Sequence, residues 1–350
     1  MRIAQIAPLA ESVPPKLYGG TERIVSYLTE ELVRHGHDVT LFASGDSRTA
    51  AELHPLVDSA LRLKTEVRDA NVFTMLQLEE LRLRAHEFDV LHFHLDYLHF
   101  PLLRALGLGN AITTTHGRLD VPGYAQLFGH YAEFPLVSIS NDQRRPLPRA
   151  NWLGTVPHGL PSSVCRFEPV ARGGYLAFLG RISPEKRPDR AIEIARRAGM
   201  PLRIAAKVDA TDRKYFEAEI EPLLAQPHVQ FVGEIGEREK CEFLGGATAL
   251  LFPIDWPEPF GLVMIEAMSC GTPCVAWRAG SVPEIIHEGS SGFIVESYEE
   301  AVAAVHRAVH LDRRLVRAQF ERHFSAERMT RDYLELYRRV AATRAGKVAA

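Results

Sequence analysis

Residues 248–276 read TALLFPIDWPEPFGLVMIEAMSCGTPCVA and contain the parts of one strand–helix–strand unit. The run TALLFPI is typical of a buried strand, and LVMIEAMSC has apolar residues on every face, which is typical of a buried helix. Gly271 then supplies a left-handed helix stop, and Pro273 prevents the helix from continuing. Because TPCVAWR follows as a second strand, the stretch predicts two parallel strands joined by a helix.

Strand-like runs alternate with helix-length segments along the rest of the chain in the same way. The alternation begins at MRIAQIAP and is interrupted once, at residues 155–174, where Pro, Gly and Ser accumulate and periodicity is lost. This interruption predicts a linker between two doubly wound α/β domains with mostly parallel sheets, covering residues 1–165 and 170–324. The segments after about residue 298 predict a helical tail.

Composition narrows the class of protein. The chain has 350 residues and a net charge of −3, so there is no global case for binding nucleic acid. No apolar run is long enough to span a bilayer, and the start reads as a strand. The four cysteines are sparse and lack paired CxxC spacing, so we expect reduced core thiols in a cytoplasmic protein, with a zinc or disulfide site as the alternative. The basic tail leaves a weak peripheral membrane contact as an alternative to a solvated helix face.

Two carboxylates in the opening stretch call for an explanation. Glu258 lies in the loop at the end of a strand, and Glu266 lies inside the apolar helix, although carboxylates are rarely buried without a partner. The first could accept hydrogen bonds from sugar hydroxyls, and the second from a vicinal diol such as a ribose. The structural alternative is a solvated Glu258 and a Glu266 paired with an arginine. The turn between them exposes backbone N–H groups and a positive helix end, at Phe260, Gly261 and Leu262.

The stretch FLGRISPEKRPDRAIEIARRAG (178–199) predicts a second strand, loop and helix with basic residues at the strand end. Arg181 could bind a diphosphate in a fork, and Lys186 could act as a point charge beside the helix N-terminus. We interpret Arg187 and Arg190 as solvated surface residues.

Two further features lie where strands of the first domain end. Gly19 and Gly20 precede a helix, and their bare backbone would let an anion approach closely, although they match neither common phosphate-binding glycine motif. His116 ends the strand AITTTH at a carboxyl edge, where open α/β sheets bind ligands. His92 is interpreted as structural, and His94 could border the acceptor side.

The chain contains no Asp-x-Asp sequence, which is the arrangement that usually holds a metal ion on a nucleoside diphosphate. The phosphate charge would then have to be met by cationic side chains and helix ends. We therefore expect no metal ion and no cofactor.

Taken together, these stretches resemble the retaining glycosyltransferases of family four, which have the GT-B fold. The resemblance runs almost from end to end and is carried by GGTER (19–23), DVLHFH (89–94), TTTHG (113–117), FLGRISPEKRPDRAIEIA (178–195), FVGEIGEREK (231–240), EPFGLVMIEAMSCGTPCVA (258–276) and AGSVPEII (279–286). The sequence differs from the common pattern at His158 and Ser281, and the chain is short in its first half, where acceptors of this family bind. The resemblance implies two Rossmann-like domains facing a cleft, with a last helix, from about residue 325 to 350, that returns to the first domain.

The resemblance also implies the role of each candidate residue. Glu258 would contact the hydroxyls of the donor sugar, Glu266 the ribose, and Arg181 with Lys186 the diphosphate. In the same way, Gly20 would face the distal phosphate, His116 would lie near the donor sugar, and the end of a strand would meet the nucleotide base at Val232, Gly233 and Glu234.

The activity implied is metal-independent transfer, with retention, of a sugar from a nucleoside diphosphate sugar, with a UDP-sugar favoured, to an unknown carbohydrate, lipid or small-molecule hydroxyl. A sugar phosphorylase of the same fold and a non-catalytic nucleotide-sugar-binding protein stay open as alternatives.

Overall fold

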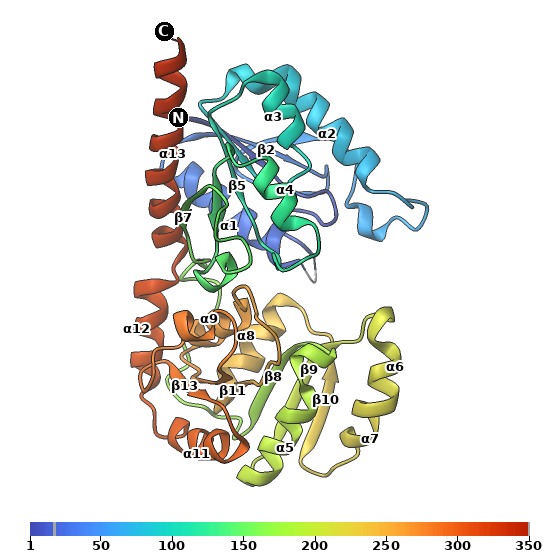
Figure 1. Cartoon of the computed structure of the whole chain (residues 1–350). Helices are drawn as coiled ribbons and strands as arrows, with labels where there is room; N and C mark the ends of the chain where they lie inside the picture. Colours follow the sequence, from blue (N-terminus) through green and yellow to red (C-terminus); the bar gives the residue numbers. More distant parts are fainter. Residues whose placement is uncertain (17–18, 349–350) are drawn as a thin grey trace. The chain divides into compact units, whose positions relative to one another are not determined.

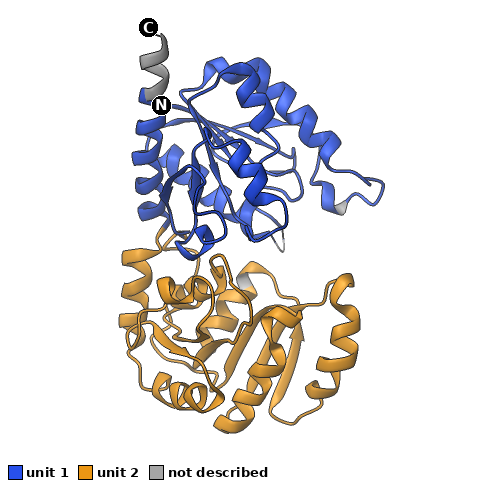
Figure 2. Ribbon diagram, in the orientation of Figure 1, with its two compact units in different colours: residues 1–159, 326–350 blue, residues 160–325 orange. Residues whose placement is uncertain are grey.

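The computed structural model describes residues 1–16 and 19–348 and divides the chain into two compact units (Figures 1 and 2). Unit 1 comprises Met1–Gly159 and the C-terminal segment from Ala326, and unit 2 comprises Leu160–Ser325. Each unit is built around one parallel sheet with helices on it, so the prediction of two Rossmann-like α/β domains is confirmed.

The sheet of unit 1 has the strand order β3-β2-β1-β4-β5-β6-β7, and every pair of neighbours is parallel. Its strands are β1 (Arg2–Ile6), β2 (Asp38–Ala43), β3 (Glu52–Pro55), β4 (Val90–Phe93), β5 (Ala111–Thr114), β6 (Leu136–Ser138) and β7 (Trp152–Thr155). Its helices are α1 (Gly20–Arg34), α2 (Asn71–Arg84), α3 (Phe100–Leu106), α4 (Tyr124–His130) and α13 (Ala326–Val348). The order of the strands changes direction at β1 and β4, which is the point where open α/β sheets bind ligands.

The last helix, α13, is part of unit 1, as the resemblance implied. It packs along α1 and touches β4 and β5 (Figure 1). Tyr333 and Tyr337 of α13 are fully buried against the sheet, one helical turn apart. The Leu336 side chain covers Gly154 of β7, where an added Cβ would lie 3.2 Å from Leu336 Cδ2. Helix α13 therefore completes the core of the first unit.

The sheet of unit 2 has the order β10-β9-β8-β11-β12-β13 and is also parallel throughout. Its strands are β8 (Leu176–Arg181), β9 (Leu202–Lys207), β10 (Val229–Gly233), β11 (Ala249–Phe252), β12 (Cys274–Trp277) and β13 (Gly292–Val295). Its helices are α5 (Pro188–Ala198), α6 (Arg213–Tyr215), α7 (Glu221–Leu224), α8 (Glu237–Gly246), α9 (Leu262–Cys270), α10 (Val282–Ile285), α11 (Tyr298–Ala308) and α12 (Arg313–His323).

The quoted stretch forms β11, α9 and β12, and the buried character of α9 follows from its composition. Every residue of α9 from Met264 to Cys270 is buried, and Gly271 ends the helix at a φ of 84°. Each of these features agrees with the prediction from the sequence. None of the helices within the described residues is long and apolar enough to cross a membrane.

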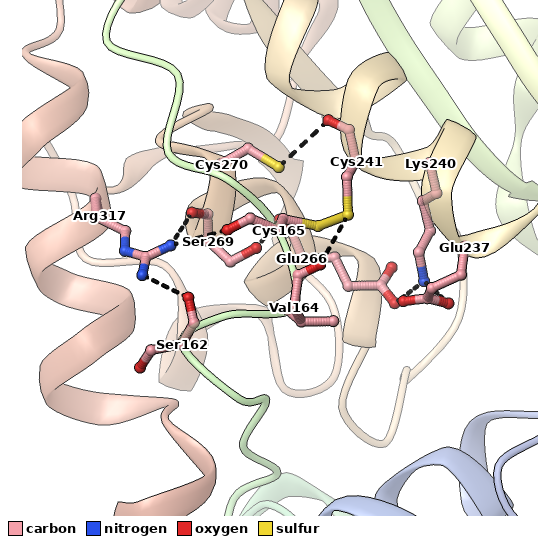
Figure 3. Close-up of a disulfide and its surroundings, with 10 residues drawn as sticks. All are labelled: Ser162, Val164, Cys165, Glu237, Lys240, Cys241, Glu266, Ser269, Cys270 and Arg317. Atoms are coloured by element: carbon pink, nitrogen blue, oxygen red, sulfur yellow. Dashed lines mark hydrogen bonds and ion pairs between the residues drawn. A yellow bond between two sulfur atoms is a disulfide. The ribbon is translucent and has the colours of Figure 1, made fainter.

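The cysteines correct one expectation. Cys270 and Cys274 are free and buried, as expected, but Cys165 and Cys241 form a disulfide. The bond ties the segment that enters unit 2 to α8, and the Cys270 thiol donates to the Cys241 carbonyl oxygen beside it (Figure 3). The expectation of four reduced thiols was wrong for this pair because the two residues are 76 positions apart in sequence and meet only through the fold.

Candidate active site

The predicted donor-binding residues of unit 2 lie at the carboxyl edge of its sheet. Arg181 is the last residue of β8, Lys186 ends the 3-10 turn Pro184–Lys186 that follows, and Glu258 lies in the loop after β11. Since β8 and β11 are neighbours in the sheet, the loops after them lie side by side. This is the edge at which parallel α/β sheets position ligand-binding side chains.

Lys186 and Glu258 form an ion pair, which brings together two residues predicted from separate motifs. Trp256 Nε1 donates a hydrogen bond of 3.1 Å to the same carboxylate oxygen, Glu258 Oε2. The Lys186 ammonium also lies 5.0 Å from the centre of the Trp256 ring and 5.7 Å from that of Phe252, within reach of cation–π attraction. The side chains of Lys186 and Glu258 are both mostly shielded from solvent, and each charge has the other as its partner.

Arg181 is held by acidic side chains from two loops. Its guanidinium donates to Glu185 Oε1 at 2.7 Å and lies 3.4 Å from Asp212 and 3.8 Å from Asp209. Lys207, the last residue of β9, pairs with Asp209 at 2.9 Å. Arg181 thus lies at the end of β8 with Glu185 as its partner. An anionic ligand that binds Arg181 would have to replace that carboxylate.

Glu266, inside α9, pairs with a lysine. Lys240 Nζ of α8 contacts Glu266 Oε1 and lies 3.1 Å from Glu237 (Figure 3). Both side chains of the Lys240–Glu266 pair are close to fully buried. The structural alternative named an arginine as the partner; the partner is Lys240. The sequence argument did not single out Lys240, which is the last residue of FVGEIGEREK. Its only signal in the sequence was a basic side chain near the start of a helix.

The backbone around Glu258 is supported by residues from the AGSVPEII stretch. The Ser281 amide donates to the Glu258 carbonyl oxygen, and the Ser281 hydroxyl donates to that of Phe260, both at 2.9 Å. Gly280 has a φ of 52°, and an added Cβ there would lie 2.3 Å from the Glu258 amide nitrogen. Ser281, a departure from the family pattern, therefore contributes a hydrogen bond that a glycine could not make.

Arg190 corrects the expectation of a solvated surface residue. It is buried in α5 and donates to the carbonyl oxygens of Pro253 and Ile254 at 3.1 and 3.3 Å. Arg187 pairs with Asp189 and Asp255, at 2.8 Å in both cases. These two arginines thus anchor the start of the loop that carries Glu258, and the one-dimensional pattern gave no sign of it.

The N-terminus of α9 begins at Leu262, after Gly261 with a φ of 79°, and no side chain in the described part of the chain caps it. The positive end of this buried helix is therefore open to an anion. The strand end predicted to meet the base is also exposed: β10 ends at Gly233 with a φ of 78°, and Val232 and Glu234 are both exposed. Phe260 is buried and packs against the ring of Phe324.

The other predicted residues, Gly19, Gly20 and His116, belong to unit 1. Gly20 starts α1, and a Cβ added to Gly19 would lie 2.7 Å from Pro15 Cβ, so Gly19 is required by close packing. His116 follows β5 and its Nε2 lies 2.8 Å from Nδ1 of His94. Its ring stacks on that of His158, with centroids 5.3 Å apart.

Burial lowers the pKa of six histidines of unit 1, namely the partly buried His37 and five histidines of the interior. For His99 and His116 the pKa falls to about 3, and for His92, His94 and His158 it falls well below the usual value. The cause is loss of hydration, which penalises the charged imidazolium. His116 is therefore a neutral imidazole at physiological pH and can act as a hydrogen-bonding group. Within residues 1–16 and 19–348, no group of three or more His, Cys, Asp or Glu side chains could hold a metal ion.

Comparison with known proteins agrees with the fold. Residues 18–151 match the model of Glycosyltransferase Family 4, and residues 169–322 match that of Glycosyl transferases group 1. HepE of Anabaena, in a crystal structure with UDP and glucose, is 17% identical with a TM-score of 0.71, over 96% of this chain and 98% of that one. The shared fold is the GT-B type, with two Rossmann-like units.

Two curated relatives were compared in sequence. The D-inositol 3-phosphate glycosyltransferase of Nocardioides is 30% identical over 48% of this chain and 42% of that protein. The glycogen synthase of Mycobacterium tuberculosis is 26% identical over 91% of this chain and 89% of that protein. The chain spans less than half the length of several relatives that it matches, the Nocardioides protein among them. The chain belongs to the group 1 glycosyl transferases, with a first unit of the Family 4 type.

Proposed function

We propose that this protein is a retaining glycosyltransferase that moves a sugar from a nucleoside diphosphate sugar, with a UDP-sugar favoured, to a hydroxyl acceptor. One observation carries the proposal: at the carboxyl edge of unit 2, each of three cations is paired with a carboxylate. The pairs are Arg181–Glu185, Lys186–Glu258 and Lys240–Glu266. Family membership and the UDP and glucose of HepE support the class of ligand.

The pairs suit a donor because its diphosphate and its hydroxyl groups need opposite partners. A diphosphate would take Arg181 and Lys186 as charge-assisted donors, which releases Glu258. The freed Glu258 carboxylate would then accept hydrogen bonds from hydroxyls of the donor sugar. The phosphate and the sugar thus take the two halves of one ion pair, so neither charge is left buried and unpaired.

The ribose would be held in a different way. Lys240 holds the Glu266 carboxylate in place in the empty protein, and a diol can bond to the carboxylate oxygen that Lys240 does not hold. Lys240 need not leave for the ribose to bind. The nucleoside part therefore meets a prepared carboxylate, while the sugar meets a carboxylate that the phosphate must first release.

Transfer builds negative charge on the leaving diphosphate. Arg181, Lys186 and the open N-terminus of α9 would stabilise it, and each well-placed donor contributes about 3–4 kcal/mol to such a transition state. With these cations present, the proposal includes no metal ion. For a retaining reaction a phosphate oxygen of the leaving group can take the proton of the incoming hydroxyl, and we assign no protein nucleophile.

The test is to incubate the full chain with UDP-glucose and with ADP- and GDP-linked sugars, with and without sugar and polyol acceptors. Release of nucleoside diphosphate should depend on one nucleotide and rise with an acceptor, and the product should keep the anomeric configuration of the donor in proton NMR. Glu266→Gln should lose most of this activity. Arg213→Ala, which removes an exposed arginine of the same unit, serves as the control.

Two outcomes would contradict the proposal. Saturable binding of a nucleotide sugar without turnover, for every acceptor supplied, would indicate a binding protein. Cleavage of a glycoside that requires inorganic phosphate and no nucleotide would indicate a phosphorylase of the same fold.

A further inference from the structure

A continuous line of polar side chains crosses the interior of unit 1, from the strand ends to the C-terminal helix. It connects, in order, His116, His94, Gln5, Tyr337, His92, Thr114 and Tyr333. The heavy-atom distances along it are 2.8, 2.9, 2.8, 2.7, 2.7 and 2.9 Å. Apart from His116 at the strand end, each member is almost completely buried. Such a line is stable only if each donor meets an acceptor.

The Gln5 amide sets the direction of the hydrogen bonds toward His116. Its Nε2 donates to the Tyr337 oxygen, so its Oε1 faces Nε2 of His94 and must accept a proton from it. A neutral imidazole carries a single N–H, which leaves Nδ1 of His94 as an acceptor. His116 must then donate from Nε2 to that atom, and its own Nδ1 carries no proton.

The direction continues consistently on the other side of Gln5. Since the Tyr337 oxygen accepts from Gln5, its hydrogen is available to Nδ1 of His92. His92 then donates from Nε2 to the Thr114 hydroxyl, which in turn donates to Tyr333. Rotating the Gln5 amide by half a turn would reverse each of these bonds and move the proton of His116 to Nδ1. The ring nitrogen of His116 that carries the proton therefore depends on the hydrogen bond between Gln5 and Tyr337 of α13.

We propose that Gln5 and Tyr337 are positioning residues that hold His116 in its Nε2–H form, so that Nδ1 accepts a hydrogen bond from a substrate hydroxyl. This rests on the proposed function only for the identity of that hydroxyl. Nδ1 of His116 is buried and has no hydrogen-bond partner within the described residues. A buried acceptor without a partner destabilises a protein, and a ligand hydroxyl would remove that cost. Burial keeps the imidazoles of the line neutral, as this requires.

The first measurement is nitrogen NMR of the full chain labelled with ¹⁵N-histidine at pH 7.5, which reports the protonated nitrogen of each ring. We expect His116 with its proton on Nε2. Tyr337→Phe removes the acceptor that fixes the Gln5 amide, and we expect His116 to become a mixture of both forms. Tyr333→Phe is the matched control, because it removes a buried hydroxyl from the same helix at the end of the line far from His116.

The second measurement is calorimetric titration of the same variants. Tyr337→Phe should weaken nucleotide-sugar binding roughly five- to tenfold, the value of one hydrogen bond, and leave nucleoside diphosphate binding unchanged. A proton on Nδ1 of His116 in the unmodified protein would overturn the proposal, and so would equal effects of Tyr337→Phe and Tyr333→Phe on His116. If no nucleotide sugar binds, the proposed function fails. The NMR signals still decide whether the line of hydrogen bonds sets which ring nitrogen of His116 carries the proton. The measurement on the unmodified chain also decides it if a variant does not fold.

Discussion

Replacing Glu258 by Gln should tighten the binding of a free nucleoside diphosphate while it slows sugar transfer. In the empty protein the Lys186 ammonium is occupied by the Glu258 carboxylate, so a diphosphate must displace that carboxylate to reach it. The amide of glutamine keeps the size of the side chain and still accepts from Trp256 Nε1, but it carries no charge. Lys186 is then available before the ligand arrives, and the opposite effect falls on the sugar, which loses a charged acceptor.

The magnitude follows from how exposed the ion pair is. The side chains of Lys186 and Glu258 are 20% and 12% exposed. Exposed ion pairs are worth about 0–1 kcal/mol, and breaking buried ones costs about 3–5 kcal/mol. A pair between these limits should oppose the diphosphate by about 1–2 kcal/mol, which corresponds to a Kd lower by roughly five- to thirtyfold. Loss of the hydrogen bonds to the sugar should reduce kcat/KM by about 1.5–3 kcal/mol.

The assay pairs calorimetric titration with UDP and transfer kinetics with the nucleotide sugar. Glu242→Gln is the control, because it removes one carboxylate from an exposed position of α8 and tests whether net charge alone strengthens binding. We expect that control to leave both quantities within about twofold. Weaker UDP binding in Glu258→Gln would refute the exchange of partners, and so would an equal gain in the control.

Four other changes have expected outcomes. Arg181→Ala or Lys186→Ala should raise the transfer barrier by about 2 kcal/mol or more with an unchanged circular dichroism spectrum, and turnover equal to the unmodified chain would exclude that residue from the phosphate site. Excess EDTA should leave transfer intact, whereas complete loss restored by Mg²⁺ or Mn²⁺ would contradict the cation-only site. Burial keeps the five interior histidines neutral in the folded chain, whereas the unfolded chain takes up protons near pH 6.5. The free energy of unfolding should therefore fall as the pH drops below about 6.5, by at most about 1.4 kcal/mol per pH unit for each histidine. Urea unfolding that shows equal stability at pH 7.5 and 5 would contradict this expectation. Reduction of the Cys165–Cys241 bond should lower the melting temperature. Because the two residues are 76 positions apart, chain entropy sets about 4.5 kcal/mol as the upper value for the loss in free energy of unfolding. The melting temperature of a chain with both cysteines changed to Ser should not depend on reductant.

The sequence was sufficient where a feature is local. The alternation of strands and helices, the glycine stop after α9 and the buried character of that helix follow from the order of neighbouring residues, and all are present in the structure. The position of Arg181 and Glu258 at strand ends is local in the same sense. A parallel sheet brings all its carboxyl ends to one edge, so their nearness follows from the fold class.

The partners of these residues could not be predicted, because they depend on distances in space. Lys240 is 26 positions from Glu266, and Arg190 is 63 positions from the carbonyl oxygen of Pro253 to which it donates. A lysine or arginine in an amphipathic helix has the same local pattern whether it faces water or a buried carboxylate. The same reason explains the missed disulfide between Cys165 and Cys241.

The place of α13 in unit 1 has a consequence for synthesis of the chain on the ribosome. Gln5 is made 332 residues before Tyr337, yet each is the other's partner. At about 5–20 residues per second, residues 160–337 take roughly 10–35 s to be added. During that time the first sheet stays without the helix that covers β4 and β5, and His92 lacks the Tyr337 hydroxyl to which it bonds. We therefore expect the incomplete first unit to bind chaperones during synthesis. A chain truncated at residue 325 would lack this part of the core permanently.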